Sequence, residues 1–188
     1  AREAVDDGSD PVIVFDEMSG VMEDLGVRFA AGECFLPELV GAAEAMQAAS
    51  SVLEDAIKKS GADRRTLGSV VAGTVHGDIH SIGIQMVCTL LSAAGFDVRY
   101  LGIDVPAEVF VEAAKEAAAD IVALSALLTV TASEQARVIE LLHAAGLKDK
   151  VKIMVGGGAI TADFALSIGA DGYEPSAVGA VDLAKRFM

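Results

Sequence analysis

The chain has no tryptophan and only two cysteines, Cys34 and Cys88, among its 188 residues. The cysteines are far apart and form no CxxC motif, so neither a disulfide framework nor a thiolate zinc site is indicated. We expect both to be small buried apolar residues. Aromatic residues make up only 5% of the sequence, which is too few to indicate a platform for base stacking.

Positive charge is scarce as well. The chain has 14 Lys and Arg residues against 28 Asp and Glu residues, a net charge of −14. This charge repels phosphate backbones and anionic lipid, and no basic stripe offsets it, so we expect no nucleic-acid partner. No apolar run reaches the roughly 18 residues that a membrane span needs. The first residues are acidic where a secretory signal is basic, so we predict a cytoplasmic protein with no membrane partner.

The first sixty residues have the periodicity of helices. Apolar residues recur at three- and four-residue steps from Val14 to Phe29, which places them on one helical stripe. Gly32 interrupts the pattern. A second helix is predicted from about Leu36 to Ile57, with Pro37 in its first turn. Residues 61–65 are polar and are predicted to be a linker, so residues 1–62 form a helical cap. The first stripe is Val14, Met18, Val21, Met22, Leu25 and Phe29.

From residue 66 the pattern changes to a repeat of strand, loop and helix. The strand candidates are short and apolar, as expected for strands that helices cover on both faces. We predict an α/β domain over residues 66–188 with a five-stranded parallel sheet, because parallel neighbours need crossover helices. Strands are predicted at residues 69–74, 97–102, 121–125, 151–155 and 170–173, and helices at 84–94, 107–118, 132–145, 163–168 and 177–187.

Polar residues and glycines gather where the first strand ends. Gly77 and Gly83 bracket Asp78 and His80, which are two residues apart. Glycines allow a tight turn and close approach of a ligand. A carboxylate that binds one nitrogen of an imidazole fixes its tautomer and leaves the other nitrogen free to bind a metal. The spacing therefore indicates a metal ligand with its supporting group; the alternative is a histidine that only lines a polar loop.

Two further strand ends carry unusual loops. The third strand is followed by a hydroxyl-rich stretch from Ser125 to Thr131, and the fourth by three consecutive glycines, 156–158. In parallel sheets a ligand binds beyond the carboxyl ends of the strands, where the strand order reverses. We expect these loops to form one site.

Together these motifs resemble the cobalamin-binding domain shared by corrinoid proteins of methyltransferase systems and cobalamin-dependent methionine synthase. The stretch Gly32–Leu39 is similar to the helical cap of the methyltransferase branch, so the resemblance spans roughly residues 14–187. It implies a flavodoxin-like (Rossmann-like) sheet behind an N-terminal helical cap. That cap usually has four helices, and this sequence offers two, so it would be incomplete here. The matching residues are Asp78, His80 and Gly83, then Ser125 and Leu127, then Gly156 and Gly157.

The resemblance implies a cobalamin cofactor, alternating between methylcobalamin and cob(I)alamin, whose benzimidazole leaves the cobalt while its nucleotide tail enters the domain. His80 would be the lower cobalt ligand, Asp78 its hydrogen-bond partner and Thr131 an extension of that relay. Phe35 and Leu36 would cover the upper face of the cobalt. The other implied contacts are Gly77, Ile79, Ser81 and Gly83 in the loop, Ser125, Leu127 and Thr129 near the tail, Gly156 and Gly157 leaving room for it, and Ala177 beside it.

The implied function is a methyl carrier, not a complete enzyme. It would accept a methyl group from a substrate-specific methyltransferase and yield it to a folate- or thiol-methylating partner. Ser81 replaces a residue that is often acidic in the family, and Ile84-Gln85 replaces Lys-Asn, which bears on the partner that docks there.

Four alternatives remain from the sequence. They are a cobalamin-dependent regulatory or light sensor, a fragment of an adenosylcobalamin mutase, a flavin or phosphoryl ligand on the same fold, and a zinc pair of His76 with His80. The zinc pair lacks an intervening glutamate and a clear third ligand.

Overall fold

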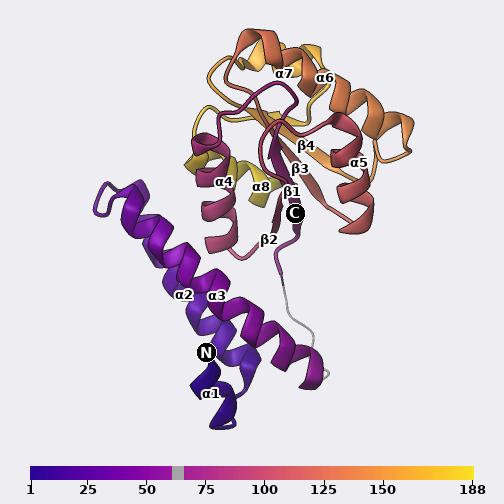
Figure 1. The fold of residues 1–188 in the computed structure, drawn as a ribbon. Coiled ribbons are helices and arrows are strands. Elements are labelled where there is room, and N and C mark those ends of the chain that lie inside the picture. The colour runs from indigo at the N-terminus through magenta and orange to yellow at the C-terminus, as the bar shows by residue number, and fades with distance from the viewer. Residues whose placement is uncertain (61–65) are drawn as a thin grey trace. The chain divides into compact units, whose positions relative to one another are not determined.

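The computed structural model describes residues 1–60 and 66–188, with only the backbone described at some positions of the N-terminal helices. The described chain forms two compact units (Figure 1). One consists of Ala1–Thr66 and Ser92–Gly95, and the other of Leu67–Leu91 and Phe96–Met188. The predicted linker, residues 61–65, lies outside the described residues.

The N-terminal unit contains α1 (Arg2–Asp6), α2 (Pro11–Ala30) and α3 (Leu36–Ser60). The N–H of Val12 donates to Asp10 Oδ1 at 2.9 Å, which caps α2. At the start of α3 the N–H of Phe35 donates to Glu38 Oε2 at 2.8 Å. The two long predicted helices are confirmed, α3 continues three residues beyond the predicted end, and the short helix α1 is additional.

The apolar stripe of α2 differs in one position from the prediction. Phe15 and Met22 are buried and pack with Met46, Leu53 and Ile57 of α3. Val21 is 69% exposed, so its assignment to the stripe was wrong. A helix advances 3.6 residues per turn, so positions 15, 18 and 22 share one face while position 21 turns away from it.

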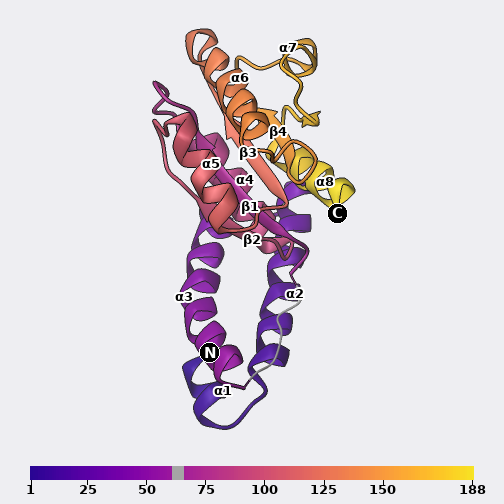
Figure 2. The same cartoon turned by 90° about the vertical axis from the view of Figure 1, so that its right-hand side faces the viewer.

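The second unit is a five-stranded sheet of order β2-β1-β3-β4-β5 in which every pair of neighbours is parallel. This confirms the predicted α/β class. Helices α4 and α8 cover one face, and α5 and α6 cover the other (Figures 1 and 2). The elements are β1 (Ser69–Thr74), α4 (Ile82–Ala93), β2 (Asp97–Tyr100), α5 (Ala107–Glu116), β3 (Ile121–Ser125), α6 (Thr129–Ala144), β4 (Lys152–Gly156), α7 (Ala162–Ser167), β5 (Gly172–Tyr173) and α8 (Ala177–Phe187).

Several boundaries move by one to three residues from the prediction. Strand β2 stops at Tyr100 because the chain turns at Gly102, whose φ is +99°. Helix α6 begins at Thr129, three residues early, since the carbonyl of Leu128 already accepts hydrogen bonds from Thr131 and Ala132. This second shift places two predicted loop threonines in the first turn of a helix. No helix among the described residues is long and apolar enough to span a bilayer.

The face of the sheet beneath α5 and α6 forms the larger core. Phe110 of α5 is fully buried there, against Gly73 of β1, and Leu124 of β3 and Leu142 of α6 belong to the same cluster. A Cβ at Gly73 would lie 3.0 Å from the Phe110 ring, so the glycine lets the ring approach the strand. This packing fixes α5 and α6 on β1 and β3, the strands whose ends carry the motifs.

We expect Phe110→Ala to lower the free energy of unfolding by about 3–5 kcal/mol, because it removes a fully buried aromatic side chain. The neighbouring Val109 is 40% exposed, so Val109→Ala is the matched control and should cost less than about 1 kcal/mol. Urea unfolding followed by circular dichroism measures both. Equal losses in the two variants would contradict the core described above.

Candidate functional site

The site begins where the sheet reverses its strand order. From β1 the chain crosses to β2 on one side, and from β3 it crosses to β4 on the other. The loops that leave β1 and β3 therefore diverge and leave a crevice between them. The backbone ties the two loops together at their start, since the N–H of Val75 donates to the carbonyl of Ser125 at 3.1 Å.

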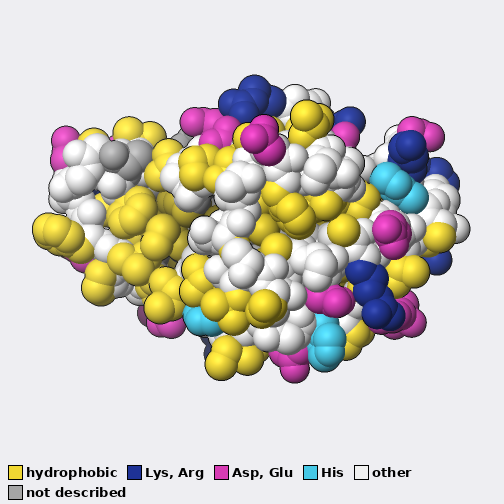
Figure 3. All heavy atoms as spheres, turned by 90° about the horizontal axis from the view of Figure 1, so that it is seen from above, with side chains coloured by type: hydrophobic (Ala, Val, Ile, Leu, Met, Phe, Trp, Pro, Cys, Tyr) yellow, Lys and Arg dark blue, Asp and Glu magenta, His cyan; other side chains and the backbone are white. Residues whose placement is uncertain are grey.

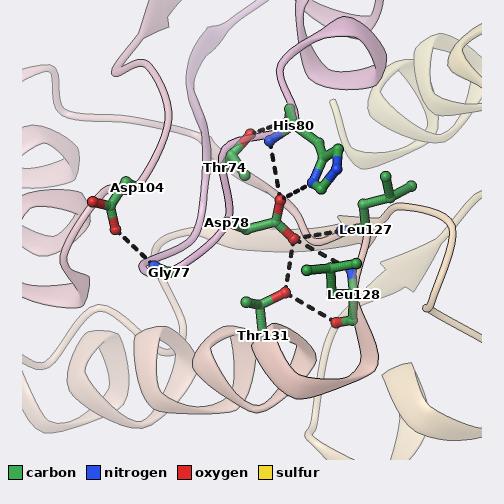
Figure 4. Close-up of polar contacts among 8 residues, drawn as sticks. All are labelled: Thr74, Gly77, Asp78, His80, Asp104, Leu127, Leu128 and Thr131. Carbon is green, nitrogen blue, oxygen red and sulfur yellow. Dashed lines mark hydrogen bonds and ion pairs between the residues drawn. The ribbon is translucent and has the colours of Figure 1, made fainter.

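Asp78 is the centre of the polar contacts in this crevice. Its side chain is fully buried and accepts hydrogen bonds on both oxygens (Figure 4). Oδ1 lies 2.7 Å from His80 Nδ1 and 3.1 Å from the His80 backbone N. Oδ2 lies 2.7 Å from both the Leu127 N and the Thr131 Oγ1, and 3.3 Å from the Leu128 N. One carboxylate thus joins the β1 loop to the start of α6.

These contacts decide the charge of Asp78 and the tautomer of His80. Burial alone would raise the pKa of Asp78, but hydrogen bonds from the Thr131 hydroxyl, from the ring and backbone of His80 and from the Leu127 N–H outweigh it and hold the pKa well below its usual value. An ionised carboxylate only accepts hydrogen bonds, so Nδ1 of His80 carries the proton. In the neutral imidazole Nε2 then has a free lone pair, and the side chain is 45% exposed.

A second set of contacts holds the loop backbone. Gly77 has a φ of +78°, and its N–H donates to Asp104 Oδ1 at 2.7 Å. The N–H of Asp104 in turn donates to the Asp78 carbonyl at 2.9 Å, and Thr74 Oγ1 donates to the His80 carbonyl at 3.0 Å. The histidine is therefore supported by its own strand and by the loop after β2, as well as by Asp78.

His76 does not join His80. Its Nδ1 lies 2.7 Å from Asp104 Oδ1, while Nδ1 of His80 binds Asp78, so each ring uses a different carboxylate. Among the residues that the structure describes, no group of three or more His, Cys, Asp or Glu side chains could hold a metal ion. The zinc alternative gains no support from this arrangement.

A cavity of about 420 Å³ opens beside His80. It lies at the carboxyl ends of β3, β4 and β5 and between residues of α4 and α8. The structure brings several predicted residues together around it, from four separate segments of the chain. These are His80, Gly83, Ser125, Leu127, Gly156, Gly157 and Ala177.

The glycines that line this cavity differ in what they are needed for. Gly157 has a φ of +116°, and a Cβ there would collide with the backbone of Ala126, so the turn itself requires glycine. Gly83 has no such φ, and a Cβ at this position would meet nothing within 4 Å. The fold does not require glycine at position 83, whereas a ligand that fills the open space would leave no room for a side chain there. The residues therefore fit a cofactor that enters deeply between α4 and the sheet.

Exposed apolar side chains lie close to His80 in the sequence and at the start of α6. Ile79 and Ile82 are 69% and 71% exposed on the two sides of His80, and Val130 is 78% exposed in the first turn of α6. Hydrophobic side chains are widely exposed on the face shown in Figure 3, with histidines among them. Exposed apolar surface near one imidazole nitrogen suits a large, flat and mainly apolar ligand better than a hydrated ion.

Some predicted residues are not part of the cavity wall. Gly77 and Ile79 are exposed residues of the loop after β1, Thr129 is exposed at the start of α6, and Ser81 precedes α4. Phe35, which is 74% exposed, and Leu36 belong to the N-terminal unit.

Other residues of the site were not predicted from the sequence. Gly158, Met154, Tyr173 and Glu174 line the cavity, and the backbone N–H groups of Leu127 and Leu128 bind Asp78. The run of three glycines already pointed to position 158. Backbone donors carry no sequence signal of their own, and from the segment around the end of β5 only Ala177 was predicted to lie beside the cofactor.

Comparison with known proteins agrees with this geometry. A family model described as a B12 binding domain matches residues 68–182, and a second B12 binding domain model matches residues 1–54. The fold and the site thus define a protein that binds a corrinoid. The chain belongs to the B12-binding corrinoid proteins of methyltransferase systems, and its cofactor is cobalamin, which includes the cobalt.

Two relatives show how far the similarity extends. The chain is 44% identical over 182 residues to trimethylamine corrinoid protein 1 of Methanosarcina acetivorans, covering 96% of this chain and 84% of the relative. It is 46% identical over 176 residues to the dimethylamine corrinoid protein of Methanosarcina barkeri, covering 94% and 82%.

Solved structures give the same result. The methanol:cobalamin methyltransferase complex MtaBC of Methanosarcina barkeri contains a chain with 32% identity and a TM-score of 0.87, covering 98% of this chain and 70% of that one. The monomethylamine corrinoid protein of the same organism has 33% identity and a TM-score of 0.63, covering 100% and 88%.

The two kinds of glycine lead to a paired test. We expect Gly157→Ala to lower the free energy of unfolding by about 1–3 kcal/mol through backbone strain. Gly83→Ala should leave stability unchanged or raise it by up to about 1 kcal/mol, because alanine favours the helix, yet its methyl group should weaken retention of hydroxocobalamin. Thermal unfolding of the apo-protein and gel filtration of the loaded protein measure the two effects. Normal cofactor retention by Gly83→Ala would show that its open space is not used.

Proposed function

We propose that this chain carries a methyl group on the cobalt of its corrinoid, with the benzimidazole of the cofactor detached and His80 as the lower ligand. It passes the group from a substrate-specific methyltransferase to a folate- or thiol-methylating partner. The observation that carries the proposal is the free Nε2 of His80, held beside the cavity by the 2.7 Å contact of its Nδ1 with buried Asp78.

Within this proposal the two parts of the site have separate tasks. A bound corrinoid would supply the cobalt chemistry of methyl uptake and release. His80 supplies the nitrogen that replaces the benzimidazole, and Asp78 keeps the proton on the opposite ring nitrogen. Thr131 fixes the second oxygen of Asp78, so the carboxylate cannot rotate away from the ring.

The cavity between α4 and α8 would receive the nucleotide tail. Ser125 offers a hydroxyl, Gly83 and Gly156 leave space along its walls, and Ala177 lies at the start of α8. A cavity of about 420 Å³ is in the range that holds a ligand fragment of this size. Affinity would then come mainly from burial of the tail, and the cobalt ligand would come from His80.

The names of the relatives support a partner of one class. The curated relatives at 44–47% identity are named as corrinoid proteins of trimethylamine and dimethylamine. We therefore propose a methylamine methyltransferase as the donor partner. The methanol:cobalamin methyltransferase complex supports direct assembly with such an enzyme. None of these relatives is named as a sensor, so the regulatory alternative is not favoured; a cytoplasmic location stays a prediction.

The proposal is tested first by titrating the apo-protein with hydroxocobalamin and with methylcobalamin, followed by gel filtration. We expect one corrinoid retained per chain and a visible spectrum in which histidine has replaced benzimidazole as the lower ligand. A retained corrinoid that keeps its benzimidazole spectrum would reject His80 as the ligand. Loss of all corrinoid on the column would reject the site itself.

A histidine pair provides the matched variants. We expect His80→Ala to abolish the histidine-bound spectrum while much of the cofactor stays bound, because burial of the tail does not depend on the ring. His76 lies four residues earlier and pairs with Asp104 outside the cavity wall, so His76→Ala should keep the wild-type spectrum. Difference spectroscopy of the two loaded variants makes the comparison, and the same spectral change in both would show that it arises from general damage to the loop.

A further inference from the structure

Gln135 is a buried polar residue that does not belong to the site described above. Gln135 lies in α6, its side chain is fully buried, and its neighbours in the core are apolar. An amide in such a place needs hydrogen-bond partners, because each unpaired polar atom destabilises the fold.

The amide nitrogen of Gln135 bridges two strands at their carboxyl ends. Nε2 donates to the carbonyl of Leu124 at 3.2 Å and to the carbonyl of Gly156 at 3.1 Å. These carbonyls belong to β3 and β4, and the Gly156 carbonyl also accepts from the N–H of Ala126 at 3.1 Å. The reverse orientation of the amide would place its oxygen against both carbonyl oxygens, so the contacts themselves assign nitrogen to this position.

The other half of the amide gains nothing from the fold. Oε1 of Gln135 is buried and accepts no hydrogen bond from the part of the chain that the structure describes. Methionine has nearly the same length and volume and would avoid this unpaired atom. The glutamine is therefore explained by its two donor contacts and not by packing.

The bridged strand ends are the ones that form the cavity wall. Gly157 and Gly158 follow directly from the bridged carbonyl of Gly156, and their turn lies against Ala126 and Leu127, where added Cβ atoms would collide. A small separation of β3 from β4 would move this turn and change the width of the cavity.

We propose that Gln135 is a positioning residue that sets the spacing of the β3 and β4 ends and thereby the fit of the cofactor's nucleotide tail. The inference rests on the proposed function, because it assumes that the tail occupies this cavity. It goes beyond that function because it assigns a new role to Gln135, which lies on the face of the sheet opposite the cavity. That role is the selection of corrinoids that carry a nucleotide tail.

The test compares cobalamin with cobinamide, a corrinoid that lacks the nucleotide tail. Dissociation constants of both, as aquo forms, are measured by absorbance for the wild type and for Gln135→Met. We expect Gln135→Met to lower the preference for cobalamin over cobinamide by about tenfold, the equivalent of roughly one lost pair of hydrogen bonds, while its affinity for cobinamide and its melting temperature stay near the wild-type values.

Leu142→Ala is the matched control for general loss of stability. Leu142 is fully buried on the same helix, two turns further along, so its truncation should lower the melting temperature and keep the preference for cobalamin. If Gln135→Met does not fold, Gln135→Asn retains the amide with a shorter reach and should lower the preference to a smaller extent.

The outcomes separate the two proposals. A wild type that prefers cobalamin, with an unchanged preference in the Gln135 variants, would overturn the role of Gln135 and leave the tail site intact. An equal fall in preference in Leu142→Ala would also overturn it, because the effect would then follow stability alone. A wild type that binds cobinamide as tightly as cobalamin would overturn the tail site, and the role of Gln135 with it.

Discussion

The buried negative charge of Asp78 is the constraint on which the rest of the site depends. An ionised carboxylate can be buried only if hydrogen bonds replace its hydration. Here the donors come from the β1 loop and from the start of α6, and the first turn of a helix also favours a negative charge through its dipole. The same contacts that stabilise the charge therefore join the two loops at the strand reversal. The same carboxylate positions His80, because the ring donates to Asp78 Oδ1, the oxygen that the start of α6 does not bind.

The cavity depends on a different property of the chain, namely small residues where the strands end. Gly157 is required by the backbone, whereas Gly83 leaves space that the fold does not use. The wall between them is formed by the ends of β3 and β4, whose carbonyls Gln135 bridges from the opposite side of the sheet. Polar contacts thus orient the imidazole of His80, and backbone spacing defines the volume beside it. The two are linked at Leu127, whose N–H donates to Asp78 and which also lines the cavity.

The architecture could be predicted from the sequence because the order of its apolar runs and helical periods fits one type of fold. Short apolar runs separated by helical periods are compatible with a covered parallel sheet and with little else, and the order of the strands placed Asp78, Ser125 and Gly156 at one edge. The apolar pattern alone could not distinguish Thr131 from Thr129; it was the family resemblance that assigned Thr131 to the relay with Asp78. Both are hydroxyl residues after the same strand, and only the actual start of α6 decides that Thr131 faces Asp78 while Thr129 faces outward. Val21 was misplaced for the same reason, since two overlapping stripes fit the periodicity of α2. Gln135 was missed because a single amide in an amphipathic helix is normally a surface residue.

The imidazole of His80 and the cavity are formed by largely different contacts, and this bears on how a methyl carrier can work. Under the proposed function, the lower ligand has to support the cobalt without being the main source of affinity, since a cofactor held chiefly through its metal would be lost whenever that bond weakened. His80 is suited to this, because its ring is 45% exposed and held by one hydrogen bond, while the partner that orients it is fully buried. Besides His80, the cavity is lined by the ends of β3, β4 and β5 and by residues of α4 and α8. Under that function, His80 would hold the metal, and the strand ends and helices that line the cavity would continue to hold the rest of the cofactor if the bond to His80 weakened.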